Sequence, residues 1–283
     1  MALLAFLLAG QRPEWGPPPP VAPFGQAALP AQRVIMPMVF PVVGKVRWDD
    51  GFGEQRAGFR HTGIDIRGPK MSPIVAPFSG TLGLKKFSFW IYADNGWAML
   101  GTHLNDDNPG KHDHKAPKDL MFAPNLTPGM RVHAGQFIGY LGESGDATAP
   151  HLHFELYAPG TGPTMGRIRN PTPSLHLAKV LSAPVPAIIP GRPRSGMTRL
   201  DGCIRKIDGD TITLILVGKQ LPNGTTLCVC HPSYVKLKLT PVAVERIGGM
   251  FALTSLPNTT QIGVNIPADS QYEGALISSI VLP

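Results

Sequence analysis

Proline and glycine recur along this chain and leave few stretches long enough for a regular helix. Its 283 residues include 31 prolines and 32 glycines, and 16% of the residues are charged. Proline interrupts helices and central strands, whereas glycine supplies the backbone angles that tight turns need. Segments such as VIMPMVFPVV, PIVAPFSGTLGL and FSFWIYADNGWAMLGTHL are typical of short strands separated by turns. We therefore expect a mainly β protein.

One of these turns has a distinct sequence. Asp94-Asn95-Gly96 separates two apolar runs. Asn-Gly readily adopts the positive φ angles of a type I′ turn, which connects paired antiparallel strands. The segment predicts a β-hairpin with a type I′ turn.

Two proline-rich stretches divide the chain into domains. Residues 1–33 contain the apolar segment MALLAFLLAG followed by an arm that includes Pro17 to Pro20, which favour polyproline II. Residues 177–200 form the second stretch, which is typical of a semi-rigid linker. We expect one domain at 34–176 and a small β-barrel or sandwich domain at 201–283.

The N-terminus and the overall charge restrict the classes of partner. MALLAFLLAG is shorter than the roughly 20 apolar residues of a membrane-spanning helix. It also lacks a basic residue before Gln11 and a clear cleavage motif, so we do not expect a secretory signal. The net charge of +7 favours anionic polymers, but the basic residues form no stripe interleaved with aromatics. We expect neither nucleic-acid binding nor a membrane span.

The cysteines all lie in the last third of the chain. Cys203, Cys228 and Cys230 are odd in number, so they form no disulfide framework for the whole protein. Cys228, Cys230 and His231 make a C-x-C-H cluster that, together with Cys203, could hold a structural zinc ion. Buried thiols are the more common arrangement, and we expect them here.

The segment APHLHFEL, residues 149–156, places two histidines on one side of a short strand. Alternate side chains of a strand point to the same face, so His151 and His153 project together, opposite Leu152 and Phe154. An isolated H-x-H is more often an ordinary histidine pair than a pair of ligands. A metal site would need further His, Asp, Glu or Cys residues from elsewhere in the chain.

The segment RHTGIDIRG, residues 60–68, supplies such partners. His61 and Asp65 lie four apart and share one face of an extended segment. Gly63 and its β-branched neighbours argue against a helix here. The imidazole, the carboxylate and one strand histidine would give three protein ligands plus a water, which is the pattern of catalytic zinc.

Five segments, taken in order, resemble the lysostaphin-type (LytM-like) zinc metallopeptidases, which are cell-wall endopeptidases with an antiparallel β fold. HTGID resembles the family's H-x-G-x-D, VAPFSGTL its V-x-A-P-x-x-G-x-V, and GTHL the segment with an isolated histidine. TPGMRVHAGQFIGYLGESG resembles the run G-x-x-V-x-x-G-x-x-I-G-x-x-G, and ATAPHLHFEL the strand T-x-x-H-L-H-F-E. RNPTPSL, at 169–175, matches the N-P that closes such domains. The resemblance covers residues 34–176 and implies an antiparallel β-sheet peptidase domain of the lysostaphin/LytM type.

The resemblance also implies roles for individual residues. His61, Asp65 and His153 are expected to bind one Zn²⁺ per chain, and His151 and His103 to be catalytic. We expect His151 to act as general base and His103 to donate a hydrogen bond to the oxyanion, although the two roles could be shared or exchanged. Glu155 shares the facing of His153 and is expected beside the site rather than as a ligand.

An insertion separates two of the matching segments. Between His103 and Gly129 the chain contains NDDNPGKHDHKAPKDLMFAPNLTP, which is longer than the loop expected in the family. We expect it to form a lid or a wall of the substrate cleft, because long structured loops tend to be functional. Its His112-Asp113-His114 could suggest a second metal site, but charged surface loops commonly contain such residues.

The resemblance implies a zinc endopeptidase that hydrolyses peptide cross-links of bacterial peptidoglycan. Members of the family differ in whether they cut glycine bridges or stem-peptide cross-links, and no motif here selects one. We expect a phage-tail or virion-associated hydrolase, with tail proteins as partners of the arm and the C-terminal domain. The alternative is an exported autolysin or bacteriocin-like hydrolase, extracellular or at the cell wall, whose C-terminal domain binds the wall. A non-catalytic scaffold of the same fold is disfavoured by the full set of His61, Asp65, His103, His151 and His153.

Overall fold

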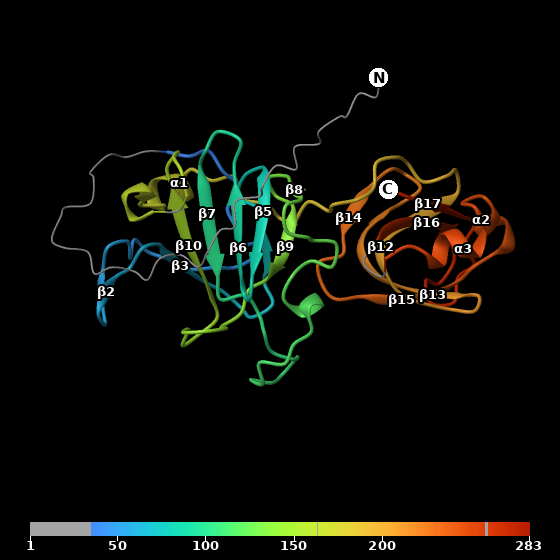
Figure 1. Ribbon diagram of the computed structural model, residues 1–283, viewed down its shortest axis with the longest axis horizontal. Helices are drawn as coiled ribbons and strands as arrows, with labels where there is room; N and C mark the ends of the chain where they lie inside the picture. The colour runs from blue at the N-terminus through green and yellow to red at the C-terminus, as the bar shows by residue number, and fades with distance from the viewer. Residues whose placement is uncertain (1–34, 163, 258–259) are drawn as a thin grey trace, which may run out of the picture.

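The computed structural model describes residues 35–162, 164–257 and 260–283, which form two β-rich parts side by side (Figure 1). The predicted N-terminal arm, residues 1–33, lies outside the described residues. Within the described ranges, the helices are too short to cross a bilayer as an apolar span. The expected mainly β architecture is confirmed.

The first domain is built on a seven-stranded antiparallel sheet. Its strands follow the order β11 (Ile168–Arg169), β10 (His151–Tyr157), β7 (Ala98–Thr102), β6 (Ser88–Tyr92), β5 (Gly80–Lys85) and β8 (Arg131–Val132), with β3 (Ile64–Arg67) paired to β10. Strand β10 pairs with β3, β7 and β11, so it lies at the centre of the site-bearing half of the sheet.

Shorter elements complete this domain. They are the hairpin of β1 (Gln55–Arg56) and β2 (Phe59–Arg60), the pair β4 (Pro73–Val75) and β9 (Phe137–Tyr140), the 3-10 turns η1 (Lys118–Leu120) and η2 (Met165–Arg167), and the helix α1 (Thr172–His176). One face of the sheet packs on an apolar core that contains Ile64, Ile66, Phe89, Leu152 and Phe154, all fully buried. The other face carries the polar side chains of the site beside a smaller apolar cluster of Trp90, Ala98, Tyr157 and Ile168.

The predicted hairpin joins β6 to β7, as expected, but its turn is of another type. The amide of Ala93 donates to the carbonyl of Trp97 at 2.8 Å, which closes the loop Asp94–Gly96. In this described segment, positive φ occurs at Gly96 alone, at 85°. A type I′ turn needs positive φ at two successive residues, so the turn type was wrong. Two ordinary turn residues followed by a left-handed glycine are typical of a three-residue hairpin loop.

The C-terminal part is a six-stranded antiparallel sheet with two short helices. The strand order is β14 (Thr226–Cys228), β13 (Thr211–Gln220), β12 (Met197–Asp208), β16 (Gln261–Pro267) and β17 (Ser279–Val281), with β15 (Tyr234–Lys238) paired to β13; the helices are α2 (Pro241–Glu245) and α3 (Gly249–Thr254). The described strands of this part pair into one continuous sheet. Strand β12 begins at Met197, inside the stretch predicted as linker.

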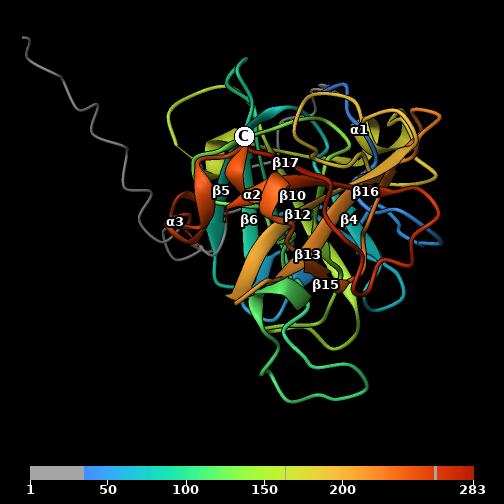
Figure 2. The same ribbon diagram turned by 90° about the vertical axis from the view of Figure 1, so that its right-hand side faces the viewer.

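The two parts contact each other through the linker and the long loop after β7. Val185 of the linker pairs with Gln136 of the first domain. The carboxylate of Asp119, in the loop, accepts hydrogen bonds from Arg205 at 2.7 Å and from the Tyr234 hydroxyl at 3.2 Å. Figure 2, which looks along the molecule from the C-terminal side, shows this loop projecting below both sheets.

The cysteines do not assemble into a metal site. Cys203 lies on β12 and Cys228 on β14, with β13 between them, so the two strands are about 10 Å apart. All three thiols are free, and among the described residues no group of potential metal ligands includes a cysteine. Cys228 and Cys230 instead pack against Phe137 and Tyr140 of the first domain. Among the described residues, the structure therefore does not gather three potential metal ligands around these thiols.

Candidate metal centre and catalytic site

Strand register places the predicted site residues opposite one another. On the β3–β10 ladder, Asp65 lies opposite His153 and Arg67 opposite His151. Directly opposed residues of antiparallel strands share one face of the sheet. Leu152 and Phe154 point into the core, fully buried, so the two histidines face the other way, as the alternation predicted.

Gly63 allows the segment that carries His61 and Asp65 to lie close to β10. A Cβ at Gly63 would lie 2.4 Å from the carbonyl oxygen of Phe154, a distance that real Cβ atoms do not tolerate. The chain can therefore pass this close to β10 only with glycine at this position. His61, two residues earlier, and Asp65, two residues later, are both brought over the same point of β10, and both are buried.

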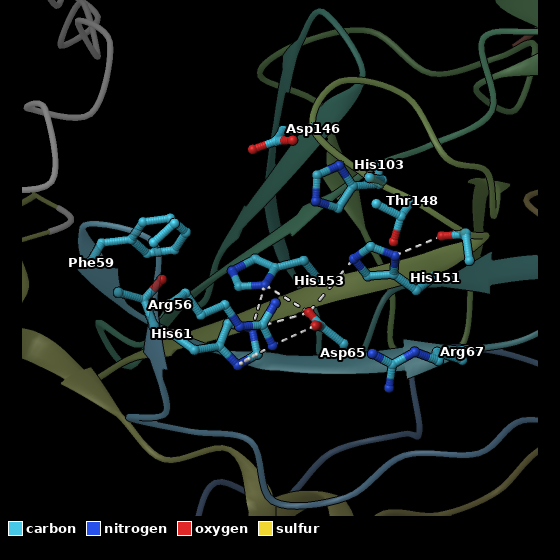
Figure 3. Close-up of a pocket in the computed structure, with 14 residues that line it drawn as sticks. Arg56, Phe59, His61, Asp65, Arg67, His103, Asp146, Thr148, His151 and His153 are labelled. Atoms are coloured by element: carbon cyan, nitrogen blue, oxygen red, sulfur yellow. Dashed lines mark hydrogen bonds and ion pairs between the residues drawn. The ribbon is translucent and has the colours of Figure 1, made fainter.

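Three atoms converge there in a near-regular triangle (Figure 3). His61 Nε2 lies 3.0 Å from Asp65 Oδ1 and 3.0 Å from His153 Nδ1, and the third side, from His153 Nδ1 to Asp65 Oδ1, is 3.1 Å. Ligands about 2.0–2.1 Å from a tetrahedral zinc ion lie about 3.3 Å from each other. The triangle is thus slightly tighter than one face of a zinc coordination sphere, and its three residues all line the cleft.

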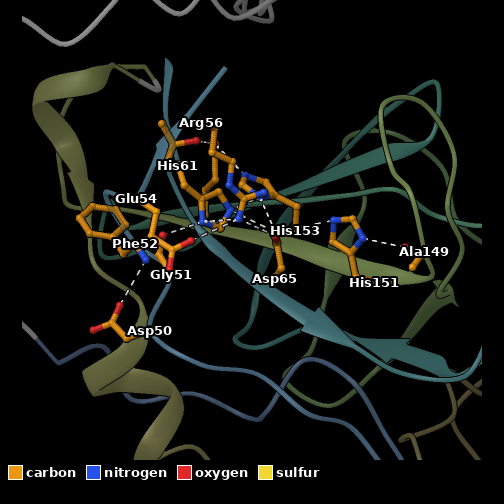
Figure 4. A network of polar contacts seen from close by, with 12 residues as sticks. Asp50, Gly51, Phe52, Glu54, Arg56, His61, Asp65, Ala149, His151 and His153 are labelled. Atoms are coloured by element: carbon orange, nitrogen blue, oxygen red, sulfur yellow. Dashed lines mark hydrogen bonds and ion pairs between the residues drawn. The ribbon is translucent and has the colours of Figure 1, made fainter. Parts of the chain in front are cut away.

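Contacts on the outer side of each ring bear on which nitrogen carries the proton. His61 Nδ1 lies 2.8 Å from the carbonyl oxygen of Gly51, to which an Nδ1–H can donate, and 3.2 Å from Arg56 Nη2; the shorter contact favours the proton on Nδ1 (Figure 4). His153 Nε2 lies 3.1 Å from Glu155 Oε1 and donates to that carboxylate. In these tautomers the nitrogens that face the triangle offer lone pairs to a cation. Three acceptors facing one another fit a cation at their centre, and this donor set suits zinc.

Glu155 lies beside the triangle rather than in it. Its carboxylate accepts hydrogen bonds from the hydroxyls of Thr62 and Tyr157 as well as from His153. Burial alone would raise the pKa of Glu155, but these donors outweigh it and hold the pKa below its usual value. An ionised Glu155 keeps the His153 ring in the orientation and tautomer that a metal needs.

The electrostatics of the site also favour positive charge at its centre. Burial would raise the pKa of Asp65, but hydrogen bonds to His153 and His61 hold it well below its usual range. Burial would lower the pKa of His153, yet Asp65 and Glu155 raise it to about 9. Both shifts show that the surrounding groups stabilise a cation at the triangle.

His103 and His151 stand side by side next to the triangle, with ring centroids 4.7 Å apart (Figure 3). The Nδ1–H of His103 donates to the carbonyl of Ser144 at 2.7 Å, and that of His151 to the carbonyl of Ala149 at 2.8 Å. His151 Nε2 lies 3.6 Å from Asp65 Oδ1. Burial is the main cause that lowers the pKa of both rings, that of His103 to about 4.

This tautomer bears on the role expected for His103. A neutral ring whose Nδ1–H is engaged by a carbonyl presents Nε2 as an acceptor, not as a donor. Both rings are therefore arranged as proton acceptors toward the cleft. A hydrogen bond from His103 to an oxyanion would require a second proton on that ring, so the geometry favours a base over the predicted donor. His103 also has a left-handed backbone, with φ 69°, a strained conformation of the kind that clusters at functional sites.

The site opens into a cleft of about 460 Å³. Sequence reasoning missed Arg56, which the β1–β2 hairpin carries over the site and whose Nη2 donates to Asp65 Oδ2 at 2.9 Å. This contact leaves the other oxygen, Oδ1, for the triangle. No local pattern in the sequence marks Arg56. Arg67, which also lines the cleft, was missed too, although its position two residues after Asp65 on one strand indicates the shared face.

The insertion does not form a wall of this cleft, whereas its expected role as a lid stays a prediction. Residues 104–128, all of them described, contribute nothing to its lining. Within the insertion, His112 and His114 contact Glu143 at 2.8 Å and Asp106 at 3.1 Å, respectively. The loop instead extends toward the C-terminal sheet, which it meets at Asp119.

Comparison with known proteins shows what this domain is similar to. Residues 59–165 match the sequence profile of Peptidase family M23. Over 124 residues, the chain is 28% identical to the DD-carboxypeptidase/endopeptidase Mpg of Neisseria meningitidis and to that of Neisseria gonorrhoeae, an alignment that covers 42% of this chain. The chain spans 25% of the length of these curated relatives.

Solved structures of the same kind also align. The catalytic domain of lysostaphin from Staphylococcus simulans aligns over 92% of its length and 46% of this chain, with 23% identity and a TM-score of 0.37. A LytM protein from Ruminococcus gnavus aligns over 62% of its length and 50% of this chain, with 21% identity and a TM-score of 0.38. The sequence match shows that residues 59–165 are similar to peptidase family M23.

Proposed function

We propose that the first domain is a zinc-dependent endopeptidase that hydrolyses peptide cross-links of bacterial peptidoglycan. The observation that carries the proposal is the triangle of three lone-pair atoms, 3.0 to 3.1 Å apart, beside two histidines whose Nε2 atoms face the same cleft. His61, Asp65 and His153 would hold the ion. The match to peptidase family M23 supports the reaction class.

The chain's own residues divide the work of hydrolysis. Zinc, when bound, polarises the scissile carbonyl and makes water acidic enough to attack near neutral pH. His151 Nε2 accepts the proton of the attacking water and later donates it to the leaving amine. His103, whose Nδ1–H donates to the carbonyl of Ser144, offers a second proton acceptor. Its ring centroid lies 4.7 Å from that of His151. Glu155 holds His153, and Arg56 holds the outer oxygen of Asp65.

The experiment combines metal analysis with digestion of cell walls. We expect about one zinc ion per chain, release of soluble fragments from purified peptidoglycan, loss of release with a chelator, and recovery after zinc is restored. Mass analysis of the fragments identifies the bond that is cut. Intact walls in the presence of zinc-loaded protein would support a non-catalytic scaffold instead.

We further propose that this hydrolase acts as part of a phage tail or virion. The proline-rich composition of residues 1–33 and the presence of a second β domain support the proposal, because both offer attachment to other proteins. An exported autolysin is the alternative setting, with the C-terminal domain bound to the wall. Copurification with phage particles supports the first setting, and retention of the isolated chain on washed walls supports the second.

A further inference from the structure

A groove of about 420 Å³ continues from the catalytic cleft and shares Arg67 and Ala149 with it. Its lining includes three cationic side chains, those of Lys45, Arg47 and Arg67. Among the described residues that line this groove there is no carboxylate. The groove is therefore a positively charged extension of the site.

Backbone pairing explains why these cations gather on one face. Arg47 and Arg67 exchange two backbone hydrogen bonds of 2.9 Å, and Arg67 lies opposite His151 on β10. Directly opposed residues project from the same face, so Arg47, Arg67 and His151 form a row across neighbouring segments. The next row contains Asp65 and His153, which are metal ligands in the proposed site. Figure 3 shows Arg67 beside Asp65 and His151.

Ion pairs within the protein do not explain why Arg47 and Arg67 lie opposite each other. Like charges directly opposite each other on paired strands destabilise a fold. Within the described part of the chain, the side chains of Lys45, Arg47 and Arg67 make no ion pair or hydrogen bond, and all three residues are exposed. Three unpaired cations beside the catalytic residues are suited to bind an anion that arrives with the substrate.

We propose that this groove recognises a carboxylate on the substrate, so that the enzyme prefers acidic stem-peptide cross-links over uncharged glycine bridges; this inference rests on the proposed function. Arg67 lies two residues from Asp65 along β3, a separation of about 7 Å. An extended peptide advances about 3.3 Å per residue. The recognised carboxylate therefore lies within about two residues of the scissile bond. Arg47 and Arg67 are the residues that determine this specificity.

The test uses matched substrates that differ in one charge. Zinc-loaded enzyme is given a stem-peptide dimer cross-linked through diaminopimelate with its carboxylate free, the same dimer with that carboxylate as a carboxamide, and pentaglycine. A charge-assisted hydrogen bond contributes enough for about a tenfold preference for the free acid in kcat/KM, expressed mainly in KM. R47Q and R67Q should each reduce this preference, and the double variant should remove it. R246Q, which removes an exposed charge from the C-terminal domain, is the matched control and should keep it.

Binding measurements separate this inference from the proposed function. Uncross-linked stem peptides contain no cross-link to cut, so calorimetry with the free acid and the carboxamide reports recognition without hydrolysis. Tighter binding of the acid, lost in R47Q/R67Q, supports the groove even if no wall is digested. Equal kcat/KM and equal affinity for acid and carboxamide would overturn the inference, while leaving a hydrolase that digests walls intact. Faster cleavage of pentaglycine than of the acidic dimer would overturn it as well.

Discussion

Two clusters of histidine and carboxylate in the first domain have similar composition but opposite electrostatic character. The first is the triangle of His61, Asp65 and His153, and the second joins Asp107 and Glu143 with His112 of the insertion. In the second cluster the ammonium of Lys70 lies 2.6 Å from Asp107 and 2.9 Å from Glu143. The protein thus supplies its own cation there. In the triangle, the nearest protein cation, Arg56, contacts the outer oxygen of Asp65 and leaves the centre to the three acceptors.

The comparison shows what separates a candidate metal site from an ion-pair cluster when both contain the same residue types. Proximity of ligand atoms is common to both clusters. The difference lies in what else each side chain contacts. In the triangle, a carbonyl and a carboxylate accept from the outer nitrogens of His61 and His153, so the inner nitrogens offer lone pairs. In the other cluster, a lysine pairs with the acids. Variants of the two clusters should therefore behave differently.

The largest effect is expected from removing the carboxylate of the triangle. D65A should lose zinc and reduce peptidoglycan release by at least about 1,000-fold, because the ion and its Lewis-acid chemistry go with it. D107A, the matched change in the second cluster, should keep zinc and keep activity. Metal content by mass spectrometry and release of dyed peptidoglycan are the measurements. Zinc retained at full stoichiometry in D65A would contradict the assignment of the triangle.

Removing the proposed base should separate metal binding from chemistry. H151A is expected to retain zinc and to lose about 100- to 10,000-fold in kcat, which is the usual contribution of a general base. H112A should leave both quantities unchanged, because His112 is exposed and contacts only the second cluster. Normal cleavage by H151A would transfer the role of base to His103, and H103A measured in parallel would then show the larger loss.

A smaller effect should follow from weakening the support of a ligand. E155Q replaces the acceptor of the His153 Nε2–H and should lower zinc affinity by about 10- to 100-fold, as changes behind a ligand typically do. Competition with a chelating dye measures the affinity, and saturating zinc should restore much of the activity. Unchanged zinc affinity would mean that Thr62 and Tyr157 hold the site without the Glu155 charge.

The sequence was sufficient to predict the triangle, because its determinants are local or periodic. Alternation along β10 placed His151 and His153 on one face, and Gly63 with its β-branched neighbours indicated an extended segment for His61 and Asp65. The resemblance to a family then gave the pairing between remote segments. A mainly β fold and a hairpin at Asp94–Gly96 followed from turn chemistry, but the turn type did not, since the preference of Asn-Gly for type I′ is overridden by the register of β6 and β7.

What the sequence did not predict depends on contacts between segments with no shared pattern. Arg56 reaches Asp65 because the β1–β2 hairpin folds over the site, and no spacing in the sequence records that. The insertion was expected to line the cleft, yet its Asp119 contacts Arg205 of the other part of the chain. The unpaired row of Arg47 and Arg67 likewise becomes visible only when their backbones are seen to pair.

The smallest effect tests the second cluster. K70M removes the ammonium from the fully buried carboxylate of Asp107 and should lower the free energy of unfolding by roughly 1–3 kcal/mol, the cost of an unsatisfied buried polar group. Zinc content and activity should not change. Thermal unfolding measures the loss, and K179M, at an exposed lysine of the linker, is the matched control. Stability equal to that of the wild type would show that the acids of this cluster do not need a cation.

The pH dependence of the stability lost in K70M shows whether the charge of Lys70 is its cause. Burial would raise the pKa of Asp107, but the hydrogen bonds from Lys70 and from the His114 amide outweigh it and lower the pKa below its ordinary value of about 3.9. Because the folded state holds this proton less tightly than the unfolded state, the contribution of Asp107 is complete above about pH 4 and is lost as the pH falls through the lowered value. The difference in melting temperature between wild type and K70M should therefore be largest near neutral pH and shrink on acidification. A difference that stays constant down to about pH 2 would assign the loss to the packing of the lysine stem rather than to its charge.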